Sequence, residues 1–311
     1  MKLKLFDLHC DTPLALYKNN FRLENSPAAV SLKKASELSE YVQIMAFWAD
    51  EKIADDTSFF AFHKAADYLN SEVERLEGEL AYARSGKEIE SLSVKNKLML
   101  SVEDARILCG RLDRLSVLYA RGIRFLIPVW GGKTIIGGAH DTDEGLTEFG
   151  KSVIEECFKV GIIPDTSHSS EKTAQEIIDM AALYEKSVMA SHSNSYSICP
   201  HTRNLRDYQF EQVKKAGGIV GISLCSLHIT KSGEASIGDV VRHIEHYLSL
   251  GGEDTVALGC DFDGTDMLPN GLKALDDIPR LADRLSQLGY TDKQINKIFY
   301  QNAKDFIDKN L

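Results

Sequence analysis

The sequence of 311 residues lacks a long hydrophobic run. No segment approaches the ~20 uninterrupted apolar residues of a membrane-spanning helix, and the amino terminus reaches Asp7 and His9 before any apolar stretch of signal-peptide length. A basic surplus is also lacking, because 46 acidic and 36 basic side chains give a net charge of −10. These absences predict a cytoplasmic protein that has neither a membrane nor a nucleic acid as its partner.

Paired cysteines and glycine-rich phosphate loops are absent as well. The six cysteines are scattered without a CxxC pair, so we expect free thiols that are mostly buried. The segment WGGKTIIGG has neither the GxGxxG nor the GxxxxGK[ST] spacing, which argues against a nucleotide-binding loop. No Pro/Ser-rich linker interrupts the chain, and we therefore expect residues 1–311 to form a single domain.

What the sequence does contain is an alternation of short apolar runs with amphipathic stretches. The predicted strands are Leu3–His9, Val42–Phe47, Leu98–Glu103, Arg124–Trp130, Ile162–His168, Val188–His192, Ile219–Leu224 and Val256–Asp261. The predicted helices between them lie within Thr57–Arg84 and over Arg111–Arg121, Leu146–Val160, Glu171–Leu183, Asp207–Ala216 and Ile237–Leu250. Strands that alternate with helices pair in parallel, so the sequence predicts the α/β class and a (β/α)8 TIM barrel. An open, doubly wound sheet is the alternative.

Two more helical patterns follow the last predicted strand. They cover Asp277–Gln287 and Asp292–Ile307, and Thr291 is a suitable N-cap for the second. We expect these additional C-terminal helices to pack around the outside of the barrel or across one of its ends.

Imidazole and carboxylate side chains stand at the carboxyl ends of several predicted strands. They are His9, Asp11, Glu103, His168, His192 and Asp261. In a parallel barrel these ends converge on one mouth, and His9 and Asp11 share a face while Cys10 turns away. Gathered carboxylates need positive charge, and imidazole mixed with carboxylate suits zinc best. The set exceeds the three ligands of one catalytic zinc, which favours two ions bridged by Glu103.

Other polar residues are assigned more modest roles. Arg203 follows His192 by a short loop and is a candidate clamp for a substrate carboxylate, although a salt bridge with Asp207 is the alternative. Asp263 is expected to form a turn. We expect three histidines on the polar flanks of helices (His63, His243 and His246) and three in loops (His140, His201 and His228).

The motifs resemble those of the membrane (renal) dipeptidase family, the M19 metallopeptidases of the amidohydrolase-like superfamily. The likeness runs over nearly the whole chain through DLHCDT, VEDA, GLTEFGKSVI, DTSHSS, ASHSNSYSICPHTRN and GCDFDG. It implies a binuclear zinc barrel that hydrolyses dipeptides, including those that end in a D-amino acid. It also implies that the first metal is held by His9, Asp11 and Glu103 and the second by Glu103, His168 and His192.

The resemblance also implies the substrate contacts. Arg203 would bind the terminal carboxylate, and Asp261 would handle the proton and the substrate amine. One position departs from the family, because FLIPVWGGK places Trp130 where better-known members have a histidine that contacts the substrate. The Trp130 indole can still donate one hydrogen bond, and its bulk can reshape the pocket. Family members are often dimers, so a homodimer is expected by analogy alone.

The expected mechanism is attack on the peptide carbonyl by a hydroxide shared between two zinc ions. Asp261 would then pass the proton from the water to the leaving amine. One alternative is another binuclear amidohydrolase acting on a cyclic amide, a lactone or a β-lactam, with Lys133 as the nearby candidate for a modified bridging lysine. Another is a metal-containing binding protein without turnover.

Overall fold

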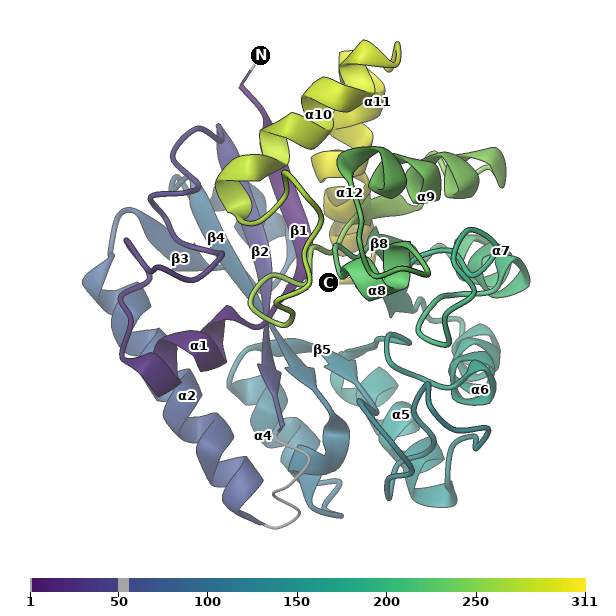
Figure 1. Ribbon diagram of the computed structural model, residues 1–311. Helices are drawn as coiled ribbons and strands as arrows, with labels where there is room; N and C mark the ends of the chain where they lie inside the picture. Colours follow the sequence, from purple (N-terminus) through teal and green to yellow (C-terminus); the bar gives the residue numbers. More distant parts are fainter. Residues whose placement is uncertain (1, 50–55) are drawn as a thin grey trace.

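The computed structural model describes residues 2–49 and 56–311. Eight parallel strands form a barrel in the order β6-β5-β4-β2-β1-β9-β8-β7, and a parallel bridge between Asp165 and Met189 joins its two edges (Figure 1). The strands are β1 (Lys4–Cys10), β2 (Glu40–Trp48), β4 (Asn96–Glu103), β5 (Ile123–Ile127), β6 (Ile163–Pro164), β7 (Met189–Ala190), β8 (Ile219–Ile222) and β9 (Val256–Leu258). A short extra strand, β3 (Leu80–Tyr82), pairs with β4. The predicted TIM barrel is confirmed, and each predicted strand overlaps one of these eight.

Helices cover the outside of the barrel, where the periodic patterns predicted them. They are α2 (Asp56–Arg75), α4 (Arg114–Ala120), α5 (Glu148–Val160), α6 (Glu171–Leu183), α7 (Asp207–Lys215) and α9 (Ile237–Ser249). Three short helices and one 3-10 turn were not predicted: α1 (Thr12–Asn19), α3 (Gly86–Ser91), α8 (Ser226–Ile229) and η1 (Ala105–Leu108). Local signals set several boundaries; for example, Ser170 caps α6 by accepting from Thr173 N–H, and Gly161 ends α5 in the left-handed region.

The last part of the chain is helical, and its final turns lie across one end of the barrel. Its helices are η2 (Leu275–Asp277), α10 (Ile278–Gln287), α11 (Asp292–Asn296), the π-helical turn η3 (Lys297–Gln301) and α12 (Asn302–Asn310). Tyr300, Phe306 and Ile307 pack in one apolar cluster with side chains from all eight barrel strands, such as Phe6 and Phe125. A cluster to which every strand contributes is the barrel interior, so η3 and α12 close this end.

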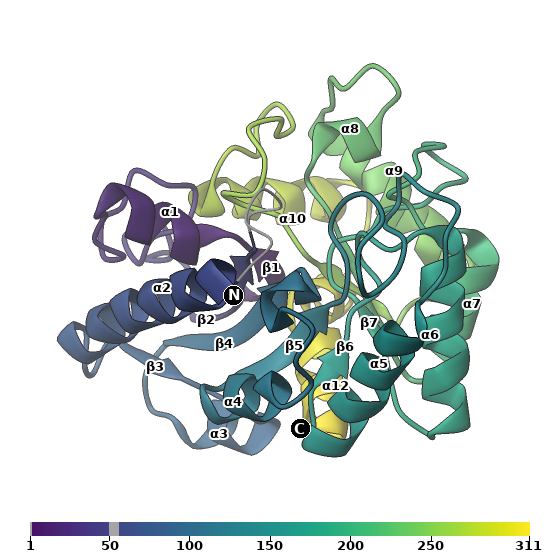
Figure 2. The same cartoon turned by 90° about the horizontal axis from the view of Figure 1, so that it is seen from below.

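The opposite end carries the functional loops. Figure 2 shows α1, α8 and the connection after β9 on one side of the sheet, and α3 and α12 on the other. α1, α8 and that connection each follow the carboxyl end of a strand, which is the end where barrel enzymes place their active sites. Within the described ranges, no helix combines the length and the apolar character needed to cross a bilayer.

Candidate active site

A β-bulge in β1 directs the first candidate ligand into the barrel. The register with β2 shifts between Asp7 and Cys10, which inserts one extra residue into β1. Leu8 belongs to the interior cluster, and the next residue, His9, also faces inward with Nε2 3.6 Å from Glu103 Oε2. Neighbouring residues of a regular strand point to opposite faces, so the bulge is what allows both to face inward. No motif in the sequence predicts this bulge.

Glu103, the last residue of β4, lies at the centre of the candidate ligands. Its Oε1 is 2.8 Å from His168 Nε2 and 3.8 Å from His192 Nε2, whereas its Oε2 faces His9. Asp11 Oδ2 lies 3.5 Å from the same His9 Nε2 atom. The structure therefore brings together all five residues for which the sequence predicted metal binding, with one carboxylate between two groups of ligands.

The two histidines from β6 and β7 present the same nitrogen to the site. His168 Nδ1 lies 3.2 Å from the Trp130 carbonyl oxygen, which can only accept, so this nitrogen carries the proton. His192 Nδ1 lies 2.8 Å from Ser191 Oγ. Both Nε2 atoms then face each other at 2.9 Å. A hydrogen bond on Nδ1 is what orients a metal-binding imidazole, and a cation beside the two Nε2 atoms would satisfy both.

Two strained backbone positions and a glycine allow the side chains of the site to lie close together. His168 and Asp261 both adopt left-handed backbone conformations, with φ of 67° and 60°. Such φ values cost free energy for residues other than glycine and concentrate at functional sites. A Cβ on Gly264 would lie 2.2 Å from Asp11 Oδ2 and 2.4 Å from Asp261 Oδ1, so only glycine fits beside these two carboxylates.

The site holds more negative charge than its own residues can neutralise. Burial, together with Asp11 and Glu103, raises the pKa of Asp261 to about 8. Burial alone would lower the pKa of His9, but Glu103 and Asp11 raise it well above its ordinary value. Such shifts are typical of carboxylates that lack a counter-ion. The donor set of imidazoles and carboxylates, and its charge, therefore fit a divalent metal.

A cavity of about 480 Å³ opens above these ligands, and we call it the main cavity. Its wall includes Trp130, whose ring lies edge-on to Trp48 at 5.3 Å between centroids. His140 and His228 also line it. The sequence pattern predicts loops for these two histidines and no role for Trp48, whereas His228 lies in α8. The available signal was that Trp48 ends β2 and that His140 and His228 belong to the connections that follow β5 and β8.

Arg203 lies in this wall with its guanidinium largely unpaired. The residue is 5% exposed, and its Nε and Nη2 have no hydrogen-bond partner within the described part of the chain. The alternative partner, Asp207, instead accepts from Ser197 Oγ and lies 2.8 Å from His246 Nε2. Burial lowers the pKa of Arg203, which reflects the free-energy cost of a cation held away from water. An anionic group bound here would reduce that cost.

Two other sequence-based assignments are settled by the structure. The prediction that His243 lies on a polar helix flank is wrong: the residue is fully buried. Its Nδ1 accepts from Ser195 N–H and its Nε2 donates to the Ile229 carbonyl, so these bonds replace water. Lys133 is exposed and pairs with Glu144 at 2.9 Å, outside the residues that line the main cavity. This placement gives no support to a bridging lysine.

Asp263 joins two loops at the mouth of the barrel. Its Oδ2 accepts from the Thr12 hydroxyl at 2.6 Å, and its Oδ1 accepts from Ala29 N–H at 2.6 Å. Its φ of 64° is that of a tight turn, as expected from the sequence. The residue therefore ties the connection after β9 to the segment that follows β1.

Comparison with known proteins identifies the family. Residues 1–306 match the family described as membrane dipeptidase, peptidase family M19. A Klebsiella pneumoniae protein described as "Uncharacterized protein in pqqA 5'region" is 31% identical over 239 residues, which are 72% of this chain and 87% of that protein.

Solved structures share the fold. A dipeptidase described as a metallo peptidase of family M19 has a TM-score of 0.92 at 24% identity and covers 100% of this chain and 99% of its own. A Rhodobacter sphaeroides metallo peptidase liganded with a phosphinate mimic of L-Ala-D-Ala has a TM-score of 0.90 at 23% identity, with both chains fully covered. The family match over nearly the whole length leads to one conclusion: the chain belongs to the membrane dipeptidase family, peptidase family M19.

Proposed function

We propose that the protein is a zinc-dependent dipeptidase whose residues 1–311 form one catalytic domain. It would hold two zinc ions and hydrolyse the amide bond of dipeptides, including those with a C-terminal D-amino acid. The observation that carries this proposal is the convergence of His9, Asp11, Glu103, His168 and His192 beside the buried, unpaired Arg203. Family membership supports a dipeptide as the substrate. The L-Ala-D-Ala mimic bound by the Rhodobacter sphaeroides relative supports the acceptance of a D-amino acid at the C-terminal position.

The ligands divide into two groups around Glu103. His9 and Asp11 face its Oε2, and His168 and His192 lie near its Oε1. We assign one ion to each group, with Glu103 shared between them. When bound, divalent metal ions lower the pKa of water and polarise a carbonyl group. The bond that His168 Nδ1 donates to the Trp130 carbonyl and the bond between His192 Nδ1 and the Ser191 hydroxyl keep the Nε2 atoms of both imidazoles directed at the site.

The remaining residues bind the substrate and move its proton. Arg203 binds the terminal carboxylate through two parallel hydrogen bonds and so sets which amide bond reaches the ligands. Asp261, whose Oδ1 lies 4.0 Å from His9 Nε2, accepts the proton that the attacking water loses and delivers it to the leaving amine. Trp130 and Trp48 form an aromatic wall that excludes water from the bound dipeptide.

The first experiment is metal analysis combined with hydrolysis assays on a panel of L,L and L,D dipeptides. We expect close to two zinc ions per chain, turnover that a chelator abolishes, and recovery when zinc is restored. Lactone, cyclic amide and β-lactam substrates serve as the comparison panel. A zinc-loaded chain that hydrolyses none of the dipeptides would refute the proposal, and turnover of the comparison panel alone would favour the other amidohydrolase reactions.

A further inference from the structure

The main cavity extends across the mouth of the barrel and joins two opposite sides of it. Arg203, in the connection after β7, lines one side, and Trp48, the last residue of β2, lines the other. In the closed order β6-β5-β4-β2-β1-β9-β8-β7, β2 is the strand farthest from β7 in both directions. Figures 1 and 2 both show α1 on one side of the molecule and α7, which follows the Arg203 loop, on the other.

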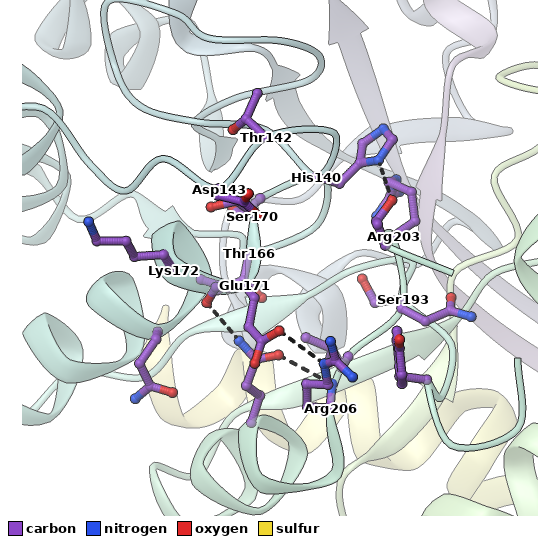
Figure 3. A pocket seen from close by; sticks show the side chains of 18 of the residues that line it. His140, Thr142, Asp143, Thr166, Ser170, Glu171, Lys172, Ser193, Arg203 and Arg206 are labelled. Carbon is purple, nitrogen blue, oxygen red and sulfur yellow. Dashed lines mark hydrogen bonds and ion pairs between the residues drawn. The ribbon is translucent and has the colours of Figure 1, made fainter. Parts of the chain in front are cut away.

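Arg203 marks the edge of the main cavity at which a substrate carboxylate would bind. Arg203 and His140 also line a second cavity, between the start of α6 and the loop 193–206. Figure 3 shows these two residues beside each other where this second cavity begins. A dipeptide held by its carboxylate at this edge has its amide bond over the metal ligands. Its N-terminal residue therefore lies beyond the ligands, on the Trp48 side of the main cavity.

The Trp48 side of the main cavity combines apolar surface with a cation. Leu14, Ala15 and Trp48 supply the apolar surface. Lys18, in the last turn of α1, also lines the cavity, and its Nζ lies over the Trp48 ring, 5.8 Å from the ring centroid. An ammonium group at this distance is attracted by the face of an indole ring. The contact therefore places the Lys18 charge against the wall of the cavity.

The Lys18 ammonium has no acidic partner in the part of the chain that the structure describes. Asp263 lines the same cavity, but its two oxygens already accept bonds from the segment after β1. The other carboxylates in the lining belong to the proposed catalytic centre: Asp11, Glu103 and Asp261. Arg203 is assigned to the terminal carboxylate of the substrate. Lys18 is therefore available for a second anionic group of the substrate.

We propose that Lys18 and Trp48 form the subsite for the side chain of the N-terminal residue of the substrate and that this subsite selects glutamate. The inference rests on the proposed function, because it requires the terminal carboxylate at Arg203 and the amide bond at the metal ligands. The methylene groups of a glutamate side chain can lie against the Trp48 ring while its carboxylate accepts a hydrogen bond from Lys18 Nζ. Glutamine has nearly the same shape without the charge, so a comparison of the two isolates the effect of Lys18.

The test compares kcat/KM for L-Glu-L-Ala and L-Gln-L-Ala. Lys18 is exposed, and an exposed ion pair predicts a preference of about two- to fivefold for Glu. Added salt should reduce this preference, because mobile ions screen an exposed pair. Lys18→Gln should bring the Glu:Gln ratio to about one, and Lys18→Glu should invert it. The matched control is Lys215→Gln, because Lys215 is also an exposed lysine in the last turn of a helix and does not line the main cavity.

The outcomes separate the subsite from the proposed function. If the zinc-loaded chain hydrolyses neither these dipeptides nor L-Ala-L-Ala, the proposed function fails. Hydrolysis of L-Ala-L-Ala with equal use of the Glu and Gln substrates would overturn the subsite alone, and so would a preference that Lys18→Gln leaves unchanged. An equal loss of the preference in Lys215→Gln would also overturn it, since the effect would then come from the net charge of the protein and not from the cavity.

Discussion

Replacing Arg203 by methionine tests the role of its unpaired guanidinium. Methionine preserves much of the length and the apolar part of the side chain, so the change removes mainly the charge and its N–H groups. Arg203 is 5% exposed and has two unpaired nitrogens, so a bound carboxylate would be held by charge-assisted hydrogen bonds away from water. Loss of such a desolvated pair costs about 3–5 kcal/mol, which corresponds to roughly a 10²- to 10⁴-fold lower kcat/KM.

The assay compares L-Ala-L-Ala with the same compound amidated at its C-terminus. The native enzyme should strongly prefer the free carboxylate, and Arg203→Met should lose most of that preference while the rate on the amide changes little. Arg206→Met is the control, because Arg206 lies three positions along the chain and pairs with Glu171 rather than facing the main cavity. Equal fractional losses on the two substrates in Arg203→Met would refute the carboxylate role.

Three further changes test the centre and the fold. Asp261→Asn should keep both metals and lower kcat by about 10²- to 10⁴-fold, and an unchanged kcat would remove Asp261 from proton transfer. Glu103→Gln should reduce the metal content below two ions per chain; a content that stays near two would place the bridge elsewhere. Burial alone would raise the pKa of Glu72, but bonds from Arg75, Arg22 and Leu23 N–H lower it to about 2. Its charge therefore stabilises the fold above pH 4.5 and progressively less as the pH falls toward 2. Urea unfolding of Glu72→Gln should show a free energy of unfolding about 1–2 kcal/mol lower than that of the native protein at pH 7, and this difference should shrink in acid. A difference that does not depend on pH would contradict this role of Glu72.

The hydrophobic pattern of the sequence predicted strands that alternate with helices and favoured a barrel, with an open, doubly wound sheet as the alternative. A short, mostly apolar run such as Leu98–Glu103 is typical of a strand buried on both faces, whereas a pattern such as that of Glu171–Leu183 buries one face of a helix. These preferences depend on near neighbours along the chain. The parallel arrangement then places the strand ends together, and this is why His9, Glu103 and His192 could be predicted as neighbours.

Only the tertiary structure decided which other groups contact these three residues and which side chains are buried. The β1 bulge that turns both Leu8 and His9 inward depends on the register with β2, and the burial of His243 depends on how α9 packs against α8 and the loop after β7. The position of Lys18 over Trp48 arises because α1 packs against β2. Such contacts join residues that are far apart in sequence. They are determined by closure of the barrel and by the paths of its loops, which local preferences do not specify.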